Sequence, residues 1–188
     1  LLKEARTIRE QMISEAKLKA TEESDKILSS ARDQINNEKM KALTELKNHV
    51  AELSIDIAEK KCSALKSWLH NEKVESAIVL AADTIVSKDG QCFGKPGSGD
   101  EARKTLSFLS GKTHAVYTGV ALGFWEKGPG FTKIKTFYEE TKVEFYPIAE
   151  DLMDQYIKSG EYKDKAGGYG IQGQALTFIK GIIGSYSN

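Results

Sequence analysis

Four residues between positions 83 and 172 have the types and the setting of a site for phosphorylated ligands. Asp83 and Thr84 directly follow an apolar run, Lys95 stands beside a proline, and Gln172 lies in the glycine-rich stretch 164–173. A carboxylate can activate water or hold Mg²⁺, whereas a lysine and exposed backbone N–H groups bind phosphate oxygens. An amide can read the polar edge of a base. Each residue alone is typical of a turn or a solvated surface, so the prediction of a nucleotide site depends on their combination.

The strands expected around these residues place Asp83 at the edge of a sheet. The apolar run 77–82 predicts a strand that is buried on both faces. Asp83 would then stand at the carboxyl end of that strand, where open α/β sheets bind ligands. Residues 114–125 predict a second strand, and residues 132–145 predict one long or hairpinned strand.

Two amphipathic helices are expected between and after these strands. Residues 100–110 carry an apolar stripe behind Asp100, which can cap the first turn, and Gly111 ends the segment. Residues 148–159 carry a second apolar stripe and are followed by Gly160. Strands and helices in this order predict an α/β domain.

The first part of the chain has a different composition. The first 67 residues contain no glycine, proline or aromatic residue, and all 16 glycines of the chain begin at Gly90. Residues 1–58 therefore predict one long helix that is rich in good helix formers. Small apolar residues recur in it at a spacing of eleven, which favours a straight or right-handed helix pair: Ala20, Ala31, Ala42 and Leu53. A helix this polar cannot form a core alone, so we expect it to have a partner helix.

The overall composition excludes several classes of protein. The 27 basic residues balance the 27 acidic ones, so no net field attracts nucleic acid or anionic lipid. No apolar run approaches the length of a membrane span, and no signal-peptide pattern opens the chain, so we expect neither membrane insertion nor secretion. Cys62 and Cys92 have no partner at metal-ligand spacing, which favours free thiols and a cytoplasmic protein.

Four segments together resemble the Maf family of nucleoside triphosphate pyrophosphatases, which share the inosine triphosphatase-like (Ham1) fold. The segments are Ala82–Val86, Gly94–Pro96, Leu109–Val120 and Asp164–Gly173. The ending 183–188 is also similar, and the resemblance begins near residue 58. It implies an α/β domain with a mixed sheet over residues 59–188.

The resemblance also implies a reaction and a role for each candidate residue. Members of the family hydrolyse a nucleoside triphosphate to the monophosphate and pyrophosphate with a divalent metal, usually Mg²⁺. Asp83 matches the position of the proton acceptor and is expected to contact the metal, and Lys95 matches a lysine near the phosphates. Thr84 and Gln172 match positions that set nucleotide choice. The setting of Gln172 is similar to that of members acting on dTTP and UTP.

The sequence departs from the family at its beginning. Members open with a strand and a Ser-x-Ser-Pro-Arg-Arg loop whose arginines grip the phosphates, and no such motif occurs here. We therefore expect an incomplete domain with impaired turnover, and a chimera joined near residues 57–61. The absence of methionine at Leu1 favours a missing upstream segment.

The segment 1–58 resembles the stalk of the F-type ATP synthase b subunit. The resemblance depends on Glu4-Ala5-Arg6, Glu15-Ala16-Lys17 and Leu53–Lys60. It implies a homodimer formed through this helix, and a generic coiled coil remains the alternative interpretation. Two functions are left open at this point. The chain is either a nucleotide pyrophosphatase that acts on dTTP or UTP, or a coiled-coil stalk protein with a non-catalytic C-terminal domain.

Overall fold

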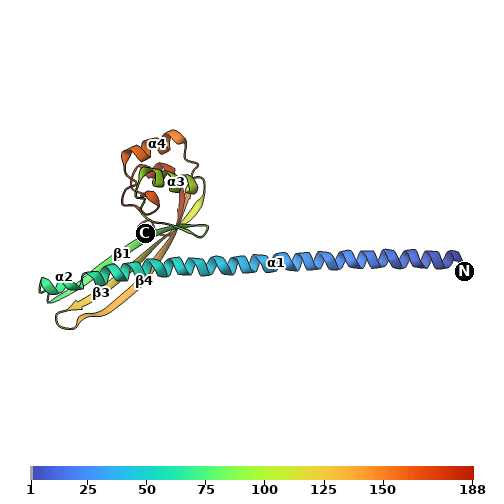
Figure 1. The fold of residues 1–188 in the computed structure, drawn as a ribbon, viewed down its shortest axis with the longest axis horizontal. Coiled ribbons are helices and arrows are strands. Elements are labelled where there is room, and N and C mark those ends of the chain that lie inside the picture. The colour runs from blue at the N-terminus through green and yellow to red at the C-terminus, as the bar shows by residue number, and fades with distance from the viewer. Residues whose placement is uncertain (1) are drawn as a thin grey trace. The chain divides into compact units, whose positions relative to one another are not determined.

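The computed structural model describes residues 2–188, so Leu1 lies outside the described residues (Figure 1). The elements, in chain order, are α1 (Leu2–Ala64), α2 (Lys66–Asn71), β1 (Ser76–Lys88), β2 (Gln91–Phe93), α3 (Gly99–Leu109), β3 (Thr113–Glu126), β4 (Gly130–Phe145), α4 (Glu150–Ser159), the 3-10 helices η1 (Ala166–Gly168) and η2 (Gln174–Phe178), and β5 (Ile179–Ile183). They divide into two compact units, residues 1–45 and residues 46–188.

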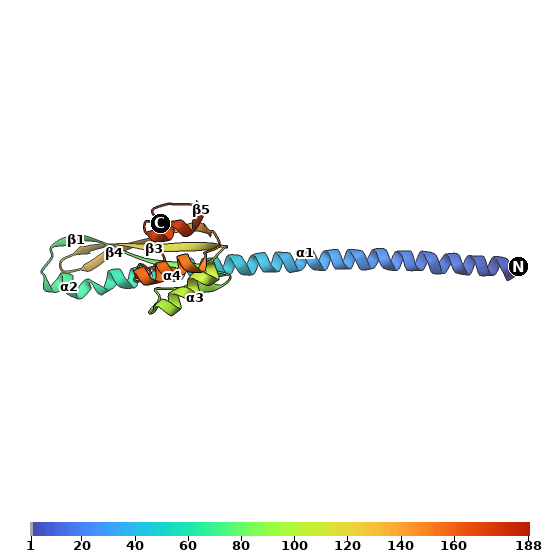
Figure 2. The same ribbon diagram turned by 90° about the horizontal axis from the view of Figure 1, so that it is seen from above.

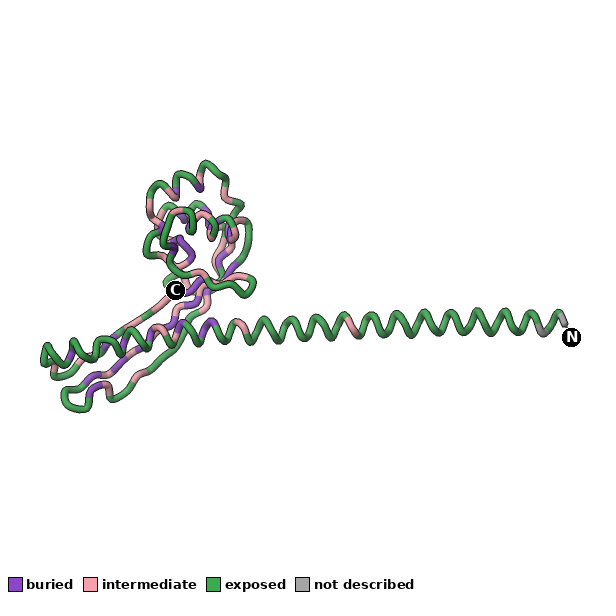
Figure 3. Tube along the Cα trace, viewed as in Figure 1, coloured by how far each residue is buried: buried purple, intermediate pink, exposed green. Residues whose placement is uncertain are grey.

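The first unit consists of the first two thirds of α1. The predicted long helix is confirmed over the described residues, and it continues beyond residue 58 to Ala64. Nearly all of its described side chains are exposed up to residue 45, apolar ones such as Ile13 and Ile35 included (Figure 3). Among the described helices, none combines the length and the apolar character needed to cross a bilayer.

The second unit is built on a sheet with the strand order β2-β1-β3-β4-β5. Every strand pairing in it is antiparallel, so the predicted mixture of helices and strands is confirmed but the sheet is not a mixed one. The two expected strands after Gly111 are present as β3 and as a single long β4. The short strands β2 and β5, at the two edges of the sheet, were not expected from the sequence.

Strand β1 differs from the prediction in two ways. It continues to Lys88, so Asp83 lies within the strand and not at its end. It is not buried on both faces either, because Ile78 and Leu80 are 68% and 69% exposed. The alternate residue Val79 packs against α1, so β1 has one covered face along this part of the strand.

The end of α1 belongs to the second unit and covers one face of the long strands (Figure 1). Apart from Val50, its buried residues are small: Ala51, Ser54, Ala58 and Cys62. Opposite them, β3 carries glycine, and a Cβ placed on Gly119 would lie 2.2 Å from the Ser54 carbonyl. The backbones of helix and strand are therefore in direct contact. The compact units divide between Glu45 and Leu46, because residues 46–64 pack on the sheet, and the boundary near residue 58 stays a prediction.

The main core lies where α3 and α4 pack on the sheet, towards the end that is remote from the β3–β4 turn (Figure 2). It uses Val86 of β1, whereas Ile85 contacts the α1 side, so the two cores lie on opposite faces. Helix α3 begins at Gly99, and the Ser98 hydroxyl accepts a hydrogen bond from the Glu101 N–H at 3.2 Å. Ser98 therefore caps α3, and the prediction of Asp100 as the cap was wrong by two residues.

Candidate active site

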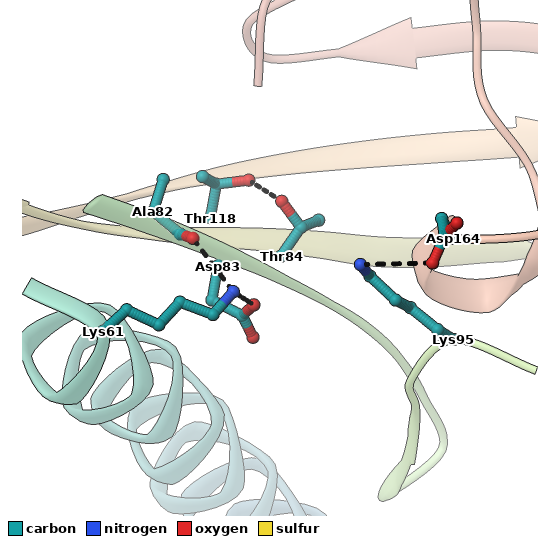
Figure 4. A network of polar contacts seen from close by, with 7 residues as sticks. All are labelled: Lys61, Ala82, Asp83, Thr84, Lys95, Thr118 and Asp164. Carbon is teal, nitrogen blue, oxygen red and sulfur yellow. Dashed lines mark hydrogen bonds and ion pairs between the residues drawn. The ribbon is translucent and has the colours of Figure 1, made fainter. Parts of the chain in front are cut away.

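A cavity of about 380 Å³ opens beside the middle of β1. Its wall is formed by the end of α1, by β1, β3, β4 and β5, by the loops after β2 and after α4, and by residues 185–188. Three of the four residues predicted to form a site line it together, namely Asp83, Thr84 and Lys95 (Figure 4). Asp83 and Thr84 are accessible within β1 because β2 pairs only with residues 86–88 of that strand, and Lys95 lies in the loop between β2 and α3.

Asp83 is held at the cavity wall by a lysine that the sequence did not predict. The Lys61 ammonium contacts the Asp83 carboxylate and also donates a hydrogen bond to the Ala82 carbonyl at 3.3 Å (Figure 4). The Asp83 side chain is only 20% exposed. Lys61 follows Ala58 by about one helical turn, so the packing of α1 on β3 directs it towards β1.

Thr84 is fixed by a neighbour across the sheet. Thr84 and Thr118 stand opposite each other in the β1–β3 register, and their hydroxyl oxygens are 2.8 Å apart (Figure 4). Either hydroxyl can be the donor in this bond, which leaves the second lone pair of the other oxygen free for a ligand. Asp83 and Thr84 are adjacent in β1, so their side chains point to opposite faces of the strand, and both residues line the cavity (Figure 4).

Lys95 forms an ion pair with the glycine-rich loop on the other side of the cavity. The Lys95 ammonium lies 3.8 Å from the Asp164 carboxylate, and both side chains are well exposed (Figure 4). The backbone N–H of Gly167 donates to the carbonyl of Gly94 at 2.9 Å, which joins the two segments. Gly167 has φ of +66°, and a Cβ there would meet Val86 at 2.8 Å, so only glycine fits.

The balance of charges around the cavity is positive. Lys61, Lys95 and Lys165 line it together with two carboxylates, those of Asp83 and Asp164. Lys61 and Lys95 each lie beside one of these carboxylates, so the net excess is one positive charge, which favours an anionic ligand such as a chain of phosphates.

Gln172 does not line this cavity. It is exposed and lies in a neighbouring hollow of about 480 Å³ with Glu161 and Gly173. The two hollows share part of their lining, including Lys165 and Tyr186. A ligand that fills the first cavity could therefore extend towards Gln172 between the glycine-rich loop and the segment that carries Tyr186 and Asn188.

The cavity offers few ligands for a metal ion. Within residues 2–188 the structure shows no group of three or more histidine, cysteine or acidic side chains that could hold one. Mg²⁺ keeps several waters and is commonly bound by one or two carboxylates together with phosphates of the substrate. Asp83 and Asp164 fit a metal that arrives with a phosphorylated ligand, and they do not form a closed metal centre.

Tyr169 is the one aromatic residue of the glycine-rich loop that is buried at the cavity wall. Burial raises the pKa of its hydroxyl far above the ordinary value, so the group stays protonated at neutral pH. The Tyr169 hydroxyl can donate a hydrogen bond but cannot act as a base. Asp83 is therefore the candidate for the base among the largely buried residues of the cavity wall.

Comparison with known proteins gives a consistent result. Residues 7–188 match the family described as Maf-like protein. The dTTP/UTP pyrophosphatase of Agathobacter rectalis is 46% identical over 143 residues, covering 74% of this chain and 69% of the relative. The protein of the same name from Bacillus cytotoxicus is 46% identical over 136 residues, covering 72% and 65%. That of Pyrococcus abyssi is 44% identical over 137 residues, covering 73% and 67%. The chain thus spans about two thirds of the length of these curated relatives.

Proposed function

Because the chain belongs to the Maf family, we propose that it is a nucleoside triphosphate pyrophosphatase, which hydrolyses dTTP or UTP to the monophosphate and pyrophosphate. The relatives named above carry that activity in their names. The domain that would perform it has the inosine triphosphatase-like fold, with residues 46–64 as its first helix.

The observation that carries the proposal is the Lys61–Asp83 pair at the wall of a lysine-rich cavity. Asp83 acts as the general base: it takes a proton from a water that attacks the α-phosphorus. The bond from that phosphorus to the oxygen bridging to the β-phosphate breaks, and pyrophosphate leaves with the bond electrons. Lys61 orients the carboxylate, and Lys95 and Lys165 stabilise the negative charge that develops on the leaving group.

Mg²⁺ bound to the substrate phosphates and to Asp83 would supply further charge neutralisation. Thr84 and Gln172 are the residues proposed to select the nucleotide. The hydroxyl of Thr84 is accessible from the cavity, and the amide of Gln172 stands at the adjoining hollow, where a base could extend.

The test is pyrophosphate release from dTTP and UTP with Mg²⁺, measured for the wild type, Asp83→Asn and Asp89→Asn. Loss of a general base predicts a fall in kcat of at least about 100-fold for Asp83→Asn. Asp89 is the matched control, because it is exposed, lies outside the cavity and has a φ of +50° that asparagine tolerates. Wild-type turnover in Asp83→Asn would contradict the assignment of the base.

A second candidate function is pairing of two chains through the long helix, in the manner of a coiled-coil stalk. It is favoured by the exposed apolar side chains along α1, including Met12, Ile27 and Leu28. Sedimentation velocity of the full chain should then show a dimer whose fraction rises with concentration. The range from about 1 to about 100 µM covers the dissociation constants of many weak dimers. A monomer at every concentration would reject this function and leave the enzyme proposal untouched.

A further inference from the structure

A buried hydrogen bond connects the sheet to the glycine-rich loop beside the cavity. The hydroxyl oxygen of Tyr169 lies 2.6 Å from Nε2 of His114, which stands on β3. Both residues are nearly inaccessible, with 3% exposure for His114 and 8% for Tyr169. Burial lowers the pKa of His114 to about 4, so the ring is neutral at physiological pH and can accept from the tyrosine hydroxyl.

Tyr169 is the only long side chain by which the middle of the loop reaches the core. Its neighbours Gly167, Gly168 and Gly170 have no side chains, and the first two have positive φ angles of 66° and 75°. Residues on both sides of Tyr169 line the cavity, namely Lys165 and Ala166 before it and Gly170 and Ile171 after it. The shape of this part of the cavity wall therefore depends on how Tyr169 is held.

The surroundings of the pair would hold an apolar ring equally well. Phe145 lies edge-on to both partners, with ring centroids 4.7 Å from His114 and 4.8 Å from Tyr169. Nδ1 of His114 is buried on the side of the ring away from Tyr169, and the backbone of Lys112 lies beside the ring. What the polar pair adds to apolar packing is a fixed direction for Tyr169.

We propose that His114 and Tyr169 are positioning residues, which hold the loop 164–173 in the shape that binds the nucleotide. The inference rests on the proposed function for its ligand, but it concerns residues that take no part in the chemistry at Asp83. Loss of the hydrogen bond lets the loop populate other conformations, and only the fraction in the binding shape contributes to affinity. Binding should weaken, while the step at the α-phosphorus should keep its rate.

The experiment compares the full chain with Tyr169→Phe and with the matched control Tyr162→Phe. Tyr162 is 8% exposed in the same core, and no hydrogen bond of its hydroxyl is found in the described part of the chain. Removing one hydrogen bond predicts a KM for dTTP about fivefold higher in Tyr169→Phe, with kcat changed less than about twofold. Tyr162→Phe should leave both constants at the wild-type values.

A double variant separates positioning from simple packing. His114→Phe alone leaves the Tyr169 hydroxyl buried without a partner, whereas His114→Phe combined with Tyr169→Phe replaces both partners by apolar rings. The double variant should regain most of the stability that His114→Phe loses, yet its KM should stay as high as in Tyr169→Phe. A KM that returns to the wild-type value together with stability would overturn the proposal.

Hydrogen–deuterium exchange gives a readout that does not need turnover. Amides of residues 164–173 should exchange faster in Tyr169→Phe than in Tyr162→Phe, while those of β3 should not change. Equal exchange of the loop in the two variants would reject the positioning role. Absence of turnover in the wild type would instead reject the proposed function, and the exchange data would still decide whether the pair holds the loop.

Discussion

The contact between α1 and β3 is tight enough to make one substitution decisive. In Gly119→Ala the new Cβ would lie 2.2 Å from the carbonyl carbon and oxygen of Ser54, where ordinary contact begins at 3.4 Å. The obstructing atoms are backbone, so no rotamer change relieves the overlap, and the helix has to move by about 1.2 Å. Overpacking of this kind costs about 3 kcal/mol of unfolding free energy.

The same displacement should reach the active site through the helix. Lys61 lies two turns after Ser54, and its bond to the Ala82 carbonyl is already 3.3 Å long, so a shift of about an ångström breaks it. Gly119→Ala should therefore lose turnover as well as stability. The loss of turnover should remain at low temperature, where the domain is still folded.

Urea unfolding followed by tryptophan fluorescence measures the effect on the second unit alone, because no aromatic residue precedes Trp68. Trp125 is the useful reporter, since it is buried between α1 and the sheet. Gly181→Ala on β5 is the control: a Cβ there meets nothing within 4 Å, so its midpoint should not fall. Equal midpoints for the two variants would refute the claim that the helix and strand backbones touch.

Two further predictions concern charge. Burial and, to a smaller extent, Lys88 lower the pKa of His114 in the folded chain to about 4. Between about pH 4 and the ordinary histidine pKa of about 6.5, the unfolded chain therefore protonates this imidazole and the folded chain does not. His114 should thus lower the unfolding free energy by up to about 3 kcal/mol as pH falls from 6.5 to 4, and His114→Phe should remove this part of the slope in urea titrations. Lys95→Met should raise the KM for dTTP about tenfold with an unchanged melting temperature, because that side chain is 60% exposed and its charge serves the ligand. A melting temperature that falls with KM would point to a structural role instead.

Local patterns in the sequence predicted the elements that are regular and covered on one face. The amphipathic stripes of α3 and α4 and the β-rich runs of β3 and β4 agree with the structure, since each pattern has the period of its element. The apolar run at the start of β1 was misleading. An exposed Ile78 has the same sequence signature as a buried one, and only the packing of α1 on one face of the strand distinguishes them.

The interactions that complete the site depend on pairs of residues far apart along the chain. The small residues Ser54 and Cys62 have little meaning in a polar helix until they are matched with Gly119 and Gly123 on a distant strand. Lys61 becomes a candidate only once that packing is known. Asp83 and Lys95 were predicted because both belong to short motifs, and both line the cavity, whereas Gln172 belongs to a motif but lies outside the cavity.

The wall of the cavity draws on α1, β1, β4 and the loop after α4, which are joined by no covalent link other than the chain itself. A molecule that fills it bridges elements that separate on unfolding, so it binds the native state and not the denatured one. By mass action, a ligand at 100 times its dissociation constant adds about 2.7 kcal/mol to the unfolding free energy. The thermal transition of the second unit thus becomes a scale on which any nucleotide or inhibitor can be ranked, whether or not it is turned over.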